Sequence, residues 1–160
     1  MDQITKRSDK IAFFKTGSGT NFSRMRGFTE FSMNKNPIEY SRRYVDEQTE
    51  RNDVVAYAPS ISYSFDKFSG DSVHADLVSI ADNESVGGDA VRYIVIVDMS
   101  TQGAQKAAYK REWTVIPDSE GDDENTYTYS GTLKANGDIV LGTATTTDDW
   151  QTCTFTEDNE

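Results

Sequence analysis

The chain has 160 residues, of which only 36% are hydrophobic, and its formal net charge is −11. This acidity argues against broad nucleic-acid affinity, because neutralising phosphates needs clustered Lys and Arg. A single cysteine excludes an intrachain disulfide, and no stretch approaches the ~18 apolar residues of a membrane span. The start, MDQITKRSDK, lacks the apolar segment of a signal peptide. We therefore expect a single domain over residues 1–160, made in a cytoplasm.

The first third of the chain predicts a polar arm and three strands. Residues 1–10 are polar and mixed in charge, and we expect them to become ordered only when something binds them. The expected strands are 11–15, 22–33 with a bend at Gly27, and 38–45.

The turn signal Asn34-Lys35-Asn36-Pro37 precedes the third strand, and residues 46–53 contain no apolar side chain. Residues 34–53 are therefore expected to form an extended loop or hairpin.

The middle of the chain predicts a strand followed by one helix. In residues 54–66, Ile61, Tyr63 and Phe65 alternate with polar residues and share one face. A helix is expected at about 71–82, capped by Asp71 or Ser72, with Val73, Leu77 and Ile80 on its apolar face. His74 falls off this stripe, so it is predicted to be a surface histidine.

The second half predicts five more strands. They are expected at 90–99, at 106–116 with Pro117 closing the strand, at 126–135, and at 150–156, with residues 139–145 returning along 126–135 through the hairpin turn Asn136-Gly137-Asp138. Residues 157–160 form a short acidic tail. The pattern predicts a mainly β, antiparallel sandwich or small barrel with one helix packed on a sheet.

Groups that could do chemistry are few. Cys153 is expected to be a half-buried strand thiol. An acidic loop, comprising Asp118, Glu120, Asp122, Asp123 and Glu124, could gather around calcium. Gly121 does not stand where an EF-hand loop needs its glycine, so a solvated loop or a contact to a basic neighbour is the favoured interpretation. The sequence predicts no enzyme, no cofactor and no metal site.

The charge is divided unevenly along the chain. Residues 1–52 contain ten Lys or Arg and seven Asp or Glu, a net of +3, whereas residues 53–160 contain six and twenty, a net of −14. Opposite charges on two parts can attract head to tail between copies, and such contacts build rings or filaments. The alternative is a soluble acidic domain whose first part happens to be less acidic.

Five segments of the sequence carry a resemblance to a known family: KIAFFKTGSG, GFTEFSMNKNPIEYSRRYVDE, VVAYAPSISYSFDKFSGDSVHADLVSIAD, KREWTVIPDSEGDDENTYTYSGTLKANGD and LGTATTTDDWQTCTFTE. They resemble tail tube (major tail) proteins of tailed bacteriophages and prophages of Gram-positive bacteria. The likeness covers roughly residues 10–156 and carries no specific residue roles.

The resemblance implies a β-sandwich-like fold flanked by a helix. It further implies hexameric rings that stack into a hollow conduit for genome delivery in the virion tail. The resemblance also implies that the tube assembles around a tape-measure protein and contacts tail terminator and distal tail or baseplate proteins. It implies no contact with a membrane. On resemblance alone, a long non-contractile tail is favoured.

The resemblance also implies inter-ring contacts from the arm and a long loop, which match residues 1–10 and 34–53 by position. The candidate contact residues are the basic side chains Lys6, Arg7, Lys35, Arg42, Arg43 and Arg51. An acidic lumen that lets DNA pass without specific binding is expected, with acids on the outer wall as the alternative. The rival class is a carbohydrate- or receptor-binding β-domain using Tyr127, Tyr129 and Trp150.

Overall fold

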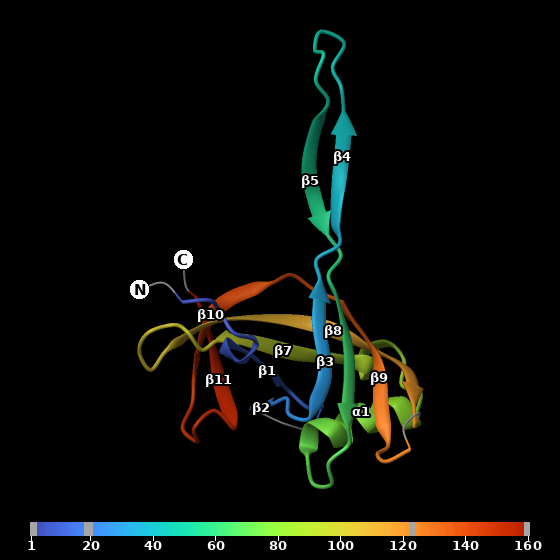
Figure 1. Cartoon of the computed structure of the whole chain (residues 1–160), viewed down its shortest axis with the longest axis vertical. Helices are drawn as coiled ribbons and strands as arrows, with labels where there is room; N and C mark the ends of the chain where they lie inside the picture. The colour runs from blue at the N-terminus through green and yellow to red at the C-terminus, as the bar shows by residue number, and fades with distance from the viewer. Residues whose placement is uncertain (1–2, 18–20, 122–123, 159–160) are drawn as a thin grey trace.

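The computed structural model describes residues 3–17, 21–121 and 124–158 (Figure 1). Its elements are η1 (Arg7–Asp9), β1 (Lys10–Phe14), β2 (Phe22–Arg24), β3 (Phe28–Asn34), β4 (Pro37–Arg42), β5 (Arg51–Tyr57), β6 (Ser60–Asp66), α1 (Ser72–Asp82), η2 (Gly87–Ala90), β7 (Val91–Asp98), β8 (Lys106–Glu120), β9 (Thr128–Ala135), β10 (Val140–Thr145) and β11 (Thr152–Glu157).

Part of the sheet closes into a small antiparallel barrel. Its strands follow the order β10-β11-β2-β1-β7-β8, and β8 pairs back onto β10 with Lys110 opposite Val140. The interior holds Phe13, Val95, Val97, Ala144 and Cys153, all of them buried. Closing the sheet on itself removes two exposed strand edges, which a short open sheet would have to protect in another way.

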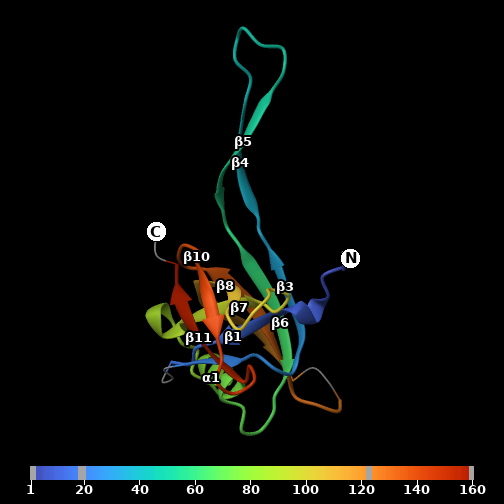
Figure 2. The same cartoon turned by 90° about the vertical axis from the view of Figure 1, so that its left-hand side faces the viewer.

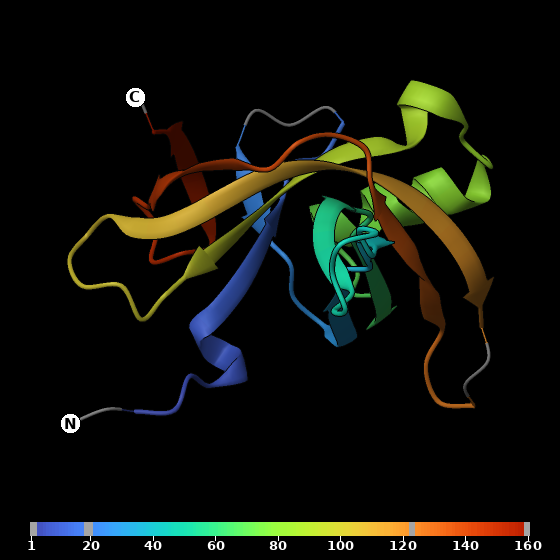
Figure 3. The same ribbon diagram turned by 90° about the horizontal axis from the view of Figure 1, so that it is seen from above.

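The long strand β8 joins this barrel to a second, helix-covered sheet. Its first part pairs with β10, whereas its second part pairs with β9, which is followed by β6 and the edge strand β3. Helix α1 lies against this part of the sheet (Figures 1 and 3). Side chains from β6, α1 and β8, among them Phe65, Leu77 and Trp113, fill the core between the two layers.

Two neighbouring phenylalanines show how one strand serves both cores. Phe13 and Phe14 are each fully buried, yet Phe13 belongs to the barrel interior and Phe14 to the helix-side core. Successive side chains of a strand point to opposite faces, so β1 lies between the two cores and needs apolar residues in both directions.

The predicted fold class, mainly antiparallel β with one helix, is confirmed, and the barrel is its observed form. Ile61, Tyr63 and Phe65 are buried on one face of β6, as predicted. The predicted helix is also present: Asp71 caps it by accepting hydrogen bonds from the backbone N–H groups of Val73 and His74.

Three predicted connections are wrong. Pro117 does not close β8, because a register shift between Pro117 and Ser119 lets the strand continue to Glu120. Residues 136–138 do not turn β9 into a hairpin with β10. Both edges of β9 are already paired, with β8 and with β6, so β10 pairs with β8 and β11 instead.

The third error concerns residues 34–37, which form an elbow between β3 and β4 rather than a turn. The predicted strand 22–33 is divided at Gly27, whose φ of 77° bends the chain. As a result, β2 joins the barrel and β3 joins the helix-covered sheet.

His74 is not on the surface, as the sequence predicted, but fully buried. Its Nδ1 accepts a hydrogen bond from the backbone N–H of Phe68 at 3.0 Å, so Nε2 carries the proton and donates it to the carbonyl of Arg26. Its ring also stacks on Phe65, with centroids 4.7 Å apart. The loop after β6 and the bend at Gly27 cover the first turn of α1, which the helical period alone could not reveal.

Replacing His74 with Phe is expected to destabilise the chain by about 2–4 kcal/mol, because the ring volume is kept while two backbone polar groups lose their partner. Urea unfolding followed by circular dichroism measures this loss. Ala75→Ser, on the exposed side of the same helix, is the control and should change the free energy of unfolding by under ~0.5 kcal/mol. An unchanged urea midpoint for His74→Phe would show that the buried hydrogen bonds contribute nothing.

Candidate assembly surface

A two-stranded hairpin, β4–β5, projects from the body of the molecule (Figures 1 and 2). It continues the β3–β6 pair, since Asn34 lies opposite Ser60 and Pro37 lies opposite Tyr57. At the elbow, Asn36 has a φ of 46°, and its side-chain amide donates to the Ala58 carbonyl and to the Ser60 hydroxyl, both at 3.1 Å. Asn tolerates this left-handed conformation, so it sets the angle between hairpin and body.

The hairpin has no hydrophobic core, yet it carries several large apolar side chains that are exposed. Tyr57 is 59% exposed, Val55 is 60% exposed and Tyr40 is 55% exposed. Ile38, Tyr44, Val45 and Val54 are exposed as well. An isolated two-stranded hairpin is at best marginally stable in water, and a contiguous exposed apolar patch marks an interaction surface. The hairpin is therefore the clearest candidate for a contact with another protein surface.

Two of the predicted contact residues, Arg42 and Arg51, already have partners within the hairpin. Arg42 Nη2 lies 2.5 Å from a carboxylate oxygen of Asp53, and its Nε donates to the Tyr44 hydroxyl at 3.0 Å. Both hydrogen bonds raise the pKa of the Arg42 guanidinium, and the bond to Tyr44 contributes more than the bond to Asp53. Arg51 donates two hydrogen bonds to Glu47, at 2.7 and 2.8 Å. Both side chains thus hold the tip of the hairpin in shape.

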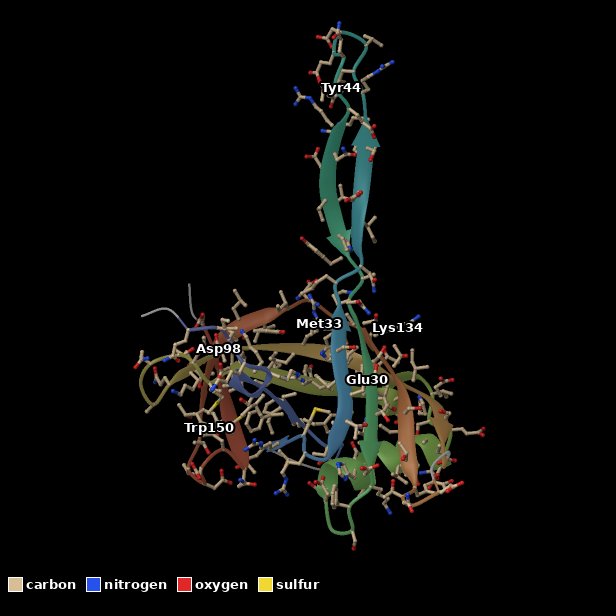
Figure 4. The ribbon with its side chains drawn as sticks, viewed as in Figure 1. Glu30, Met33, Tyr44, Asp98, Lys134 and Trp150 are labelled. Atoms are coloured by element: carbon tan, nitrogen blue, oxygen red, sulfur yellow. The ribbon has the colours of Figure 1, made fainter. Side chains whose placement is uncertain are left out.

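The other four predicted contact residues lie in two further places. Arg43 is exposed at the tip, where Tyr44 is labelled in Figure 4, and has no ion-pair partner among the described residues. Lys35 lies at the base of the hairpin, over the Tyr109 ring at 5.9 Å.

Lys6 and Arg7 lie on the N-terminal arm, and both are exposed. Arg7 is anchored by hydrogen bonds to the carbonyls of Lys10 and Phe31. The six residues therefore belong to the hairpin tip, the hairpin base and the arm, and do not form a single cluster.

The predicted acidic loop is partly a strand. Asp118 and Glu120 belong to β8, and Glu124 is exposed beyond it, whereas Asp122 and Asp123 lie outside the described residues. Among residues 3–17, 21–121 and 124–158, no three carboxylate, histidine or cysteine side chains gather closely enough to hold a metal ion.

The remaining candidate side chains lie in different parts of the molecule. Cys153 is buried in the barrel rather than half-buried, and this burial raises the pKa of its thiol to about 12. Trp150, which is labelled in Figure 4, packs near Phe13 just before β11, whereas Tyr127 lies against Tyr129 of β9. Strands β11 and β9 lie on opposite sides of the body (Figure 1), so these aromatic side chains do not share one binding platform. Within the described residues, no helix has the length and apolar character to cross a membrane.

The fold of this chain is similar to the folds of chains in three solved structures of tail-like particles. One such structure is the tail of an empty GTA particle with C6 symmetry, with a TM-score of 0.63 at 12% identity over 85% of this chain and 97% of that chain. The tube-terminating cap of the anti-feeding prophage gives 0.53 at 15% identity, over 90% and 94% of the two chains.

The baseplate of the anti-feeding prophage, six-fold symmetrised, gives a TM-score of 0.50 at 9% identity, over 88% of this chain and 97% of that chain. No family model and no curated protein matches the sequence. The three structures share the fold across most of the chain, and they come from assembled particles.

Proposed function

We propose that this chain is a structural subunit of a bacteriophage tail tube, in which six copies form a ring and stacked rings form a hollow conduit for the genome. The observation that carries the proposal is the shared fold with the C6-symmetric tail, which extends over 85% of this chain. The assignment to phages or prophages of Gram-positive bacteria rests on the resemblance of the sequence.

The exposed hairpin supports a role in assembly. No residue from Pro37 to Tyr57 is buried, although seven large apolar side chains lie there, namely Ile38, Tyr40, Tyr44, Val45, Val54, Val55 and Tyr57. Apolar surface of this kind stabilises a complex when a neighbour covers it. We propose that the hairpin lies against a neighbouring copy, with its shape set by the Arg42–Asp53 and Arg51–Glu47 pairs.

The remaining partners follow from the tube. The conduit forms around a tape-measure protein and ends at tail terminator and distal tail or baseplate proteins. The subunit has a structural rather than an enzymatic role and resides in the virion tail after synthesis in the host cytoplasm. Genomic DNA passes through the lumen without specific binding, since a chain of net charge −11 repels phosphate.

Electron microscopy tests the proposal directly. Purified chain, concentrated over a range of salt concentrations and imaged in negative stain, is expected to form rings of about six subunits and tubes. Compact monomers at every salt and protein concentration would contradict the proposal.

Arg43 allows a sharper test of the hairpin tip, because it has no ion-pair partner in the described structure. Arg43→Glu is expected to raise the protein concentration needed for tube formation about tenfold, which corresponds to ~1.4 kcal/mol per contact. Circular dichroism of the monomer should not change. Lys67→Glu, an equal charge change in the exposed loop before α1, is the control. Equal assembly by the two variants would remove Arg43 from the contact.

A further inference from the structure

A groove runs between the N-terminal strands and the free edge of the helix-covered sheet. Strand β3 ends the sheet, pairing with β6 on one side. Across from it lie the arm and the first residues of β1. Two adjoining cavities, of about 570 and 310 Å³, occupy the space and share Arg7, Lys10, Ala12 and Phe31 in their walls. Figure 4 labels Glu30 and Met33 on the strand that borders this groove.

The groove is basic in a chain that is otherwise acidic. Arg7, Lys10, Arg24, Arg26 and Lys35 line it, whereas none of its described lining residues is Asp or Glu. Asp98 lies 3.4 Å from Lys10, and Asp71 lies 4.0 Å from Arg26. The other three cations have no ion-pair partner among the described residues. The chain therefore concentrates uncompensated positive charge here, over an apolar floor that includes Phe28, Phe31 and Met33.

An acidic surface lies beside the end of α1, the end of β8 and the start of β9. A cavity of about 320 Å³ opens there between Glu84, Asp118 and Glu120, and no Lys or Arg lines it. Burial, and then the charges of Asp82 and Glu120, raise the pKa of Tyr129. Burial, with a smaller contribution from the negative charge of Asp118, raises the pKa of Tyr63 to about 12. Burial is the larger cause of both shifts, and the neighbouring carboxylates add to it.

The two surfaces are separated along the sheet. Strands β1, β2 and β3 lie nearer the middle of the body, whereas β8 ends at its outer side, as seen both from the front and from above (Figures 1 and 3). Strands β9 and β6 separate β3 from β8 in the sheet. A single copy cannot bring them together, whereas two copies placed side by side in the same orientation can.

We propose that the basic groove of one copy receives the acidic end of β8 and β9 of the next copy, around the ring. The inference rests on the proposed function and adds to it the lateral contact that closes the ring. Because different surfaces of the two copies meet, the contact is heterologous, and every copy both offers a groove and fills one. It also reduces the self-repulsion of acidic subunits, which would otherwise oppose assembly.

Charge reversal on each surface tests the contact. The groove-reversed variant carries Arg24→Glu and Lys35→Glu, and the end-reversed variant carries Asp118→Lys and Glu120→Lys; these four side chains make no ion pair within the described structure. Each variant alone should need at least about tenfold more protein to assemble, since like charges then face each other. An equimolar mixture should assemble as the wild type does, because alternating copies restore every contact.

Sedimentation velocity and negative-stain images provide the readout, and circular dichroism confirms that each variant is folded. Lys67→Glu is the control for a charge reversal outside the proposed contact. A chain that carries all four reversals should also assemble. The groove contact would be overturned if the wild type forms tubes and either variant alone assembles equally well. It would also be overturned if the wild type forms tubes and the equimolar mixture does not assemble. Neither outcome would affect the proposed tube function.

Failure of the wild type to form rings or tubes would overturn the tube function as well. Binding of duplex DNA to the wild-type groove at ~0.15 M salt, lost in the groove-reversed variant, would show that the groove serves phosphate and would overturn the proposed contact.

Discussion

Removal of the projecting hairpin is expected to abolish tube formation while the monomer stays folded. In the relevant variant, a two-residue Asn-Gly turn replaces residues 37–57 and joins the two strands that already pair at Asn34 and Ser60. The replaced residues contribute no buried side chain, so the two cores lose nothing. The neighbour of each copy, by contrast, loses the whole apolar surface that we propose it covers.

Negative-stain images at the highest soluble concentration measure the first effect, and the melting temperature measures the second. Val86→Ser is a useful control, because Val86 is a strongly exposed apolar residue outside the hairpin. Tubes of normal width formed by the shortened chain would show that the hairpin is dispensable. A shortened chain that unfolds would show instead that the hairpin stabilises its own subunit.

Replacement of Trp113 with Ala is expected to have the largest effect on stability. The indole is 1% exposed at the point where β8 passes from the barrel to the helix-covered sheet. Truncation of a buried Trp typically costs about 3–5 kcal/mol, because apolar contacts are lost and a cavity remains. A domain of this size is usually stable by about 5–15 kcal/mol, so we expect a measurable fraction of the variant to be unfolded at 37 °C.

Urea unfolding monitored by far-ultraviolet circular dichroism determines this loss. Ile116→Ala, three residues further along the same strand, removes a side chain that is 40% exposed and should cost less than about 1 kcal/mol. A Trp113→Ala variant within 1 kcal/mol of the wild type would show that the core around β8 can relax to fill the space.

The hairpin shows what local sequence signals predict and what they leave open. Residues 34–53 were predicted to project, because turn residues and charges dominate them, and most of this segment does project. Residues 54–57, Val-Val-Ala-Tyr, were instead predicted to begin a core strand, yet they form the exposed strand β5. An apolar run predicts that a surface is buried, but it does not indicate whether the chain's own core or a neighbouring copy covers that surface.

The groove was missed for a related reason. Arg7 and Lys35 were predicted as contact residues of two separate segments and Arg24 was not predicted at all, because the three residues are far apart in the sequence. Only the bend at Gly27 and the closure of the barrel bring β1, β2 and β3 around a common space. The signal available in the sequence was the positive balance of residues 1–52, which indicated a basic surface without locating it.

The sequence by itself determined the elements whose signals are local: the alternation of Ile61, Tyr63 and Phe65, the Asp71 cap with the apolar face of α1, and the β-rich, acidic character of the chain. The tertiary structure alone decided which strands pair, that β8 serves two sheets, and that His74 is buried. These outcomes depend on contacts between residues far apart in the chain. Which strand pairs with a given edge, and which segment covers a helix turn, is decided by the rest of the fold. Local period and propensity carry no information about that choice.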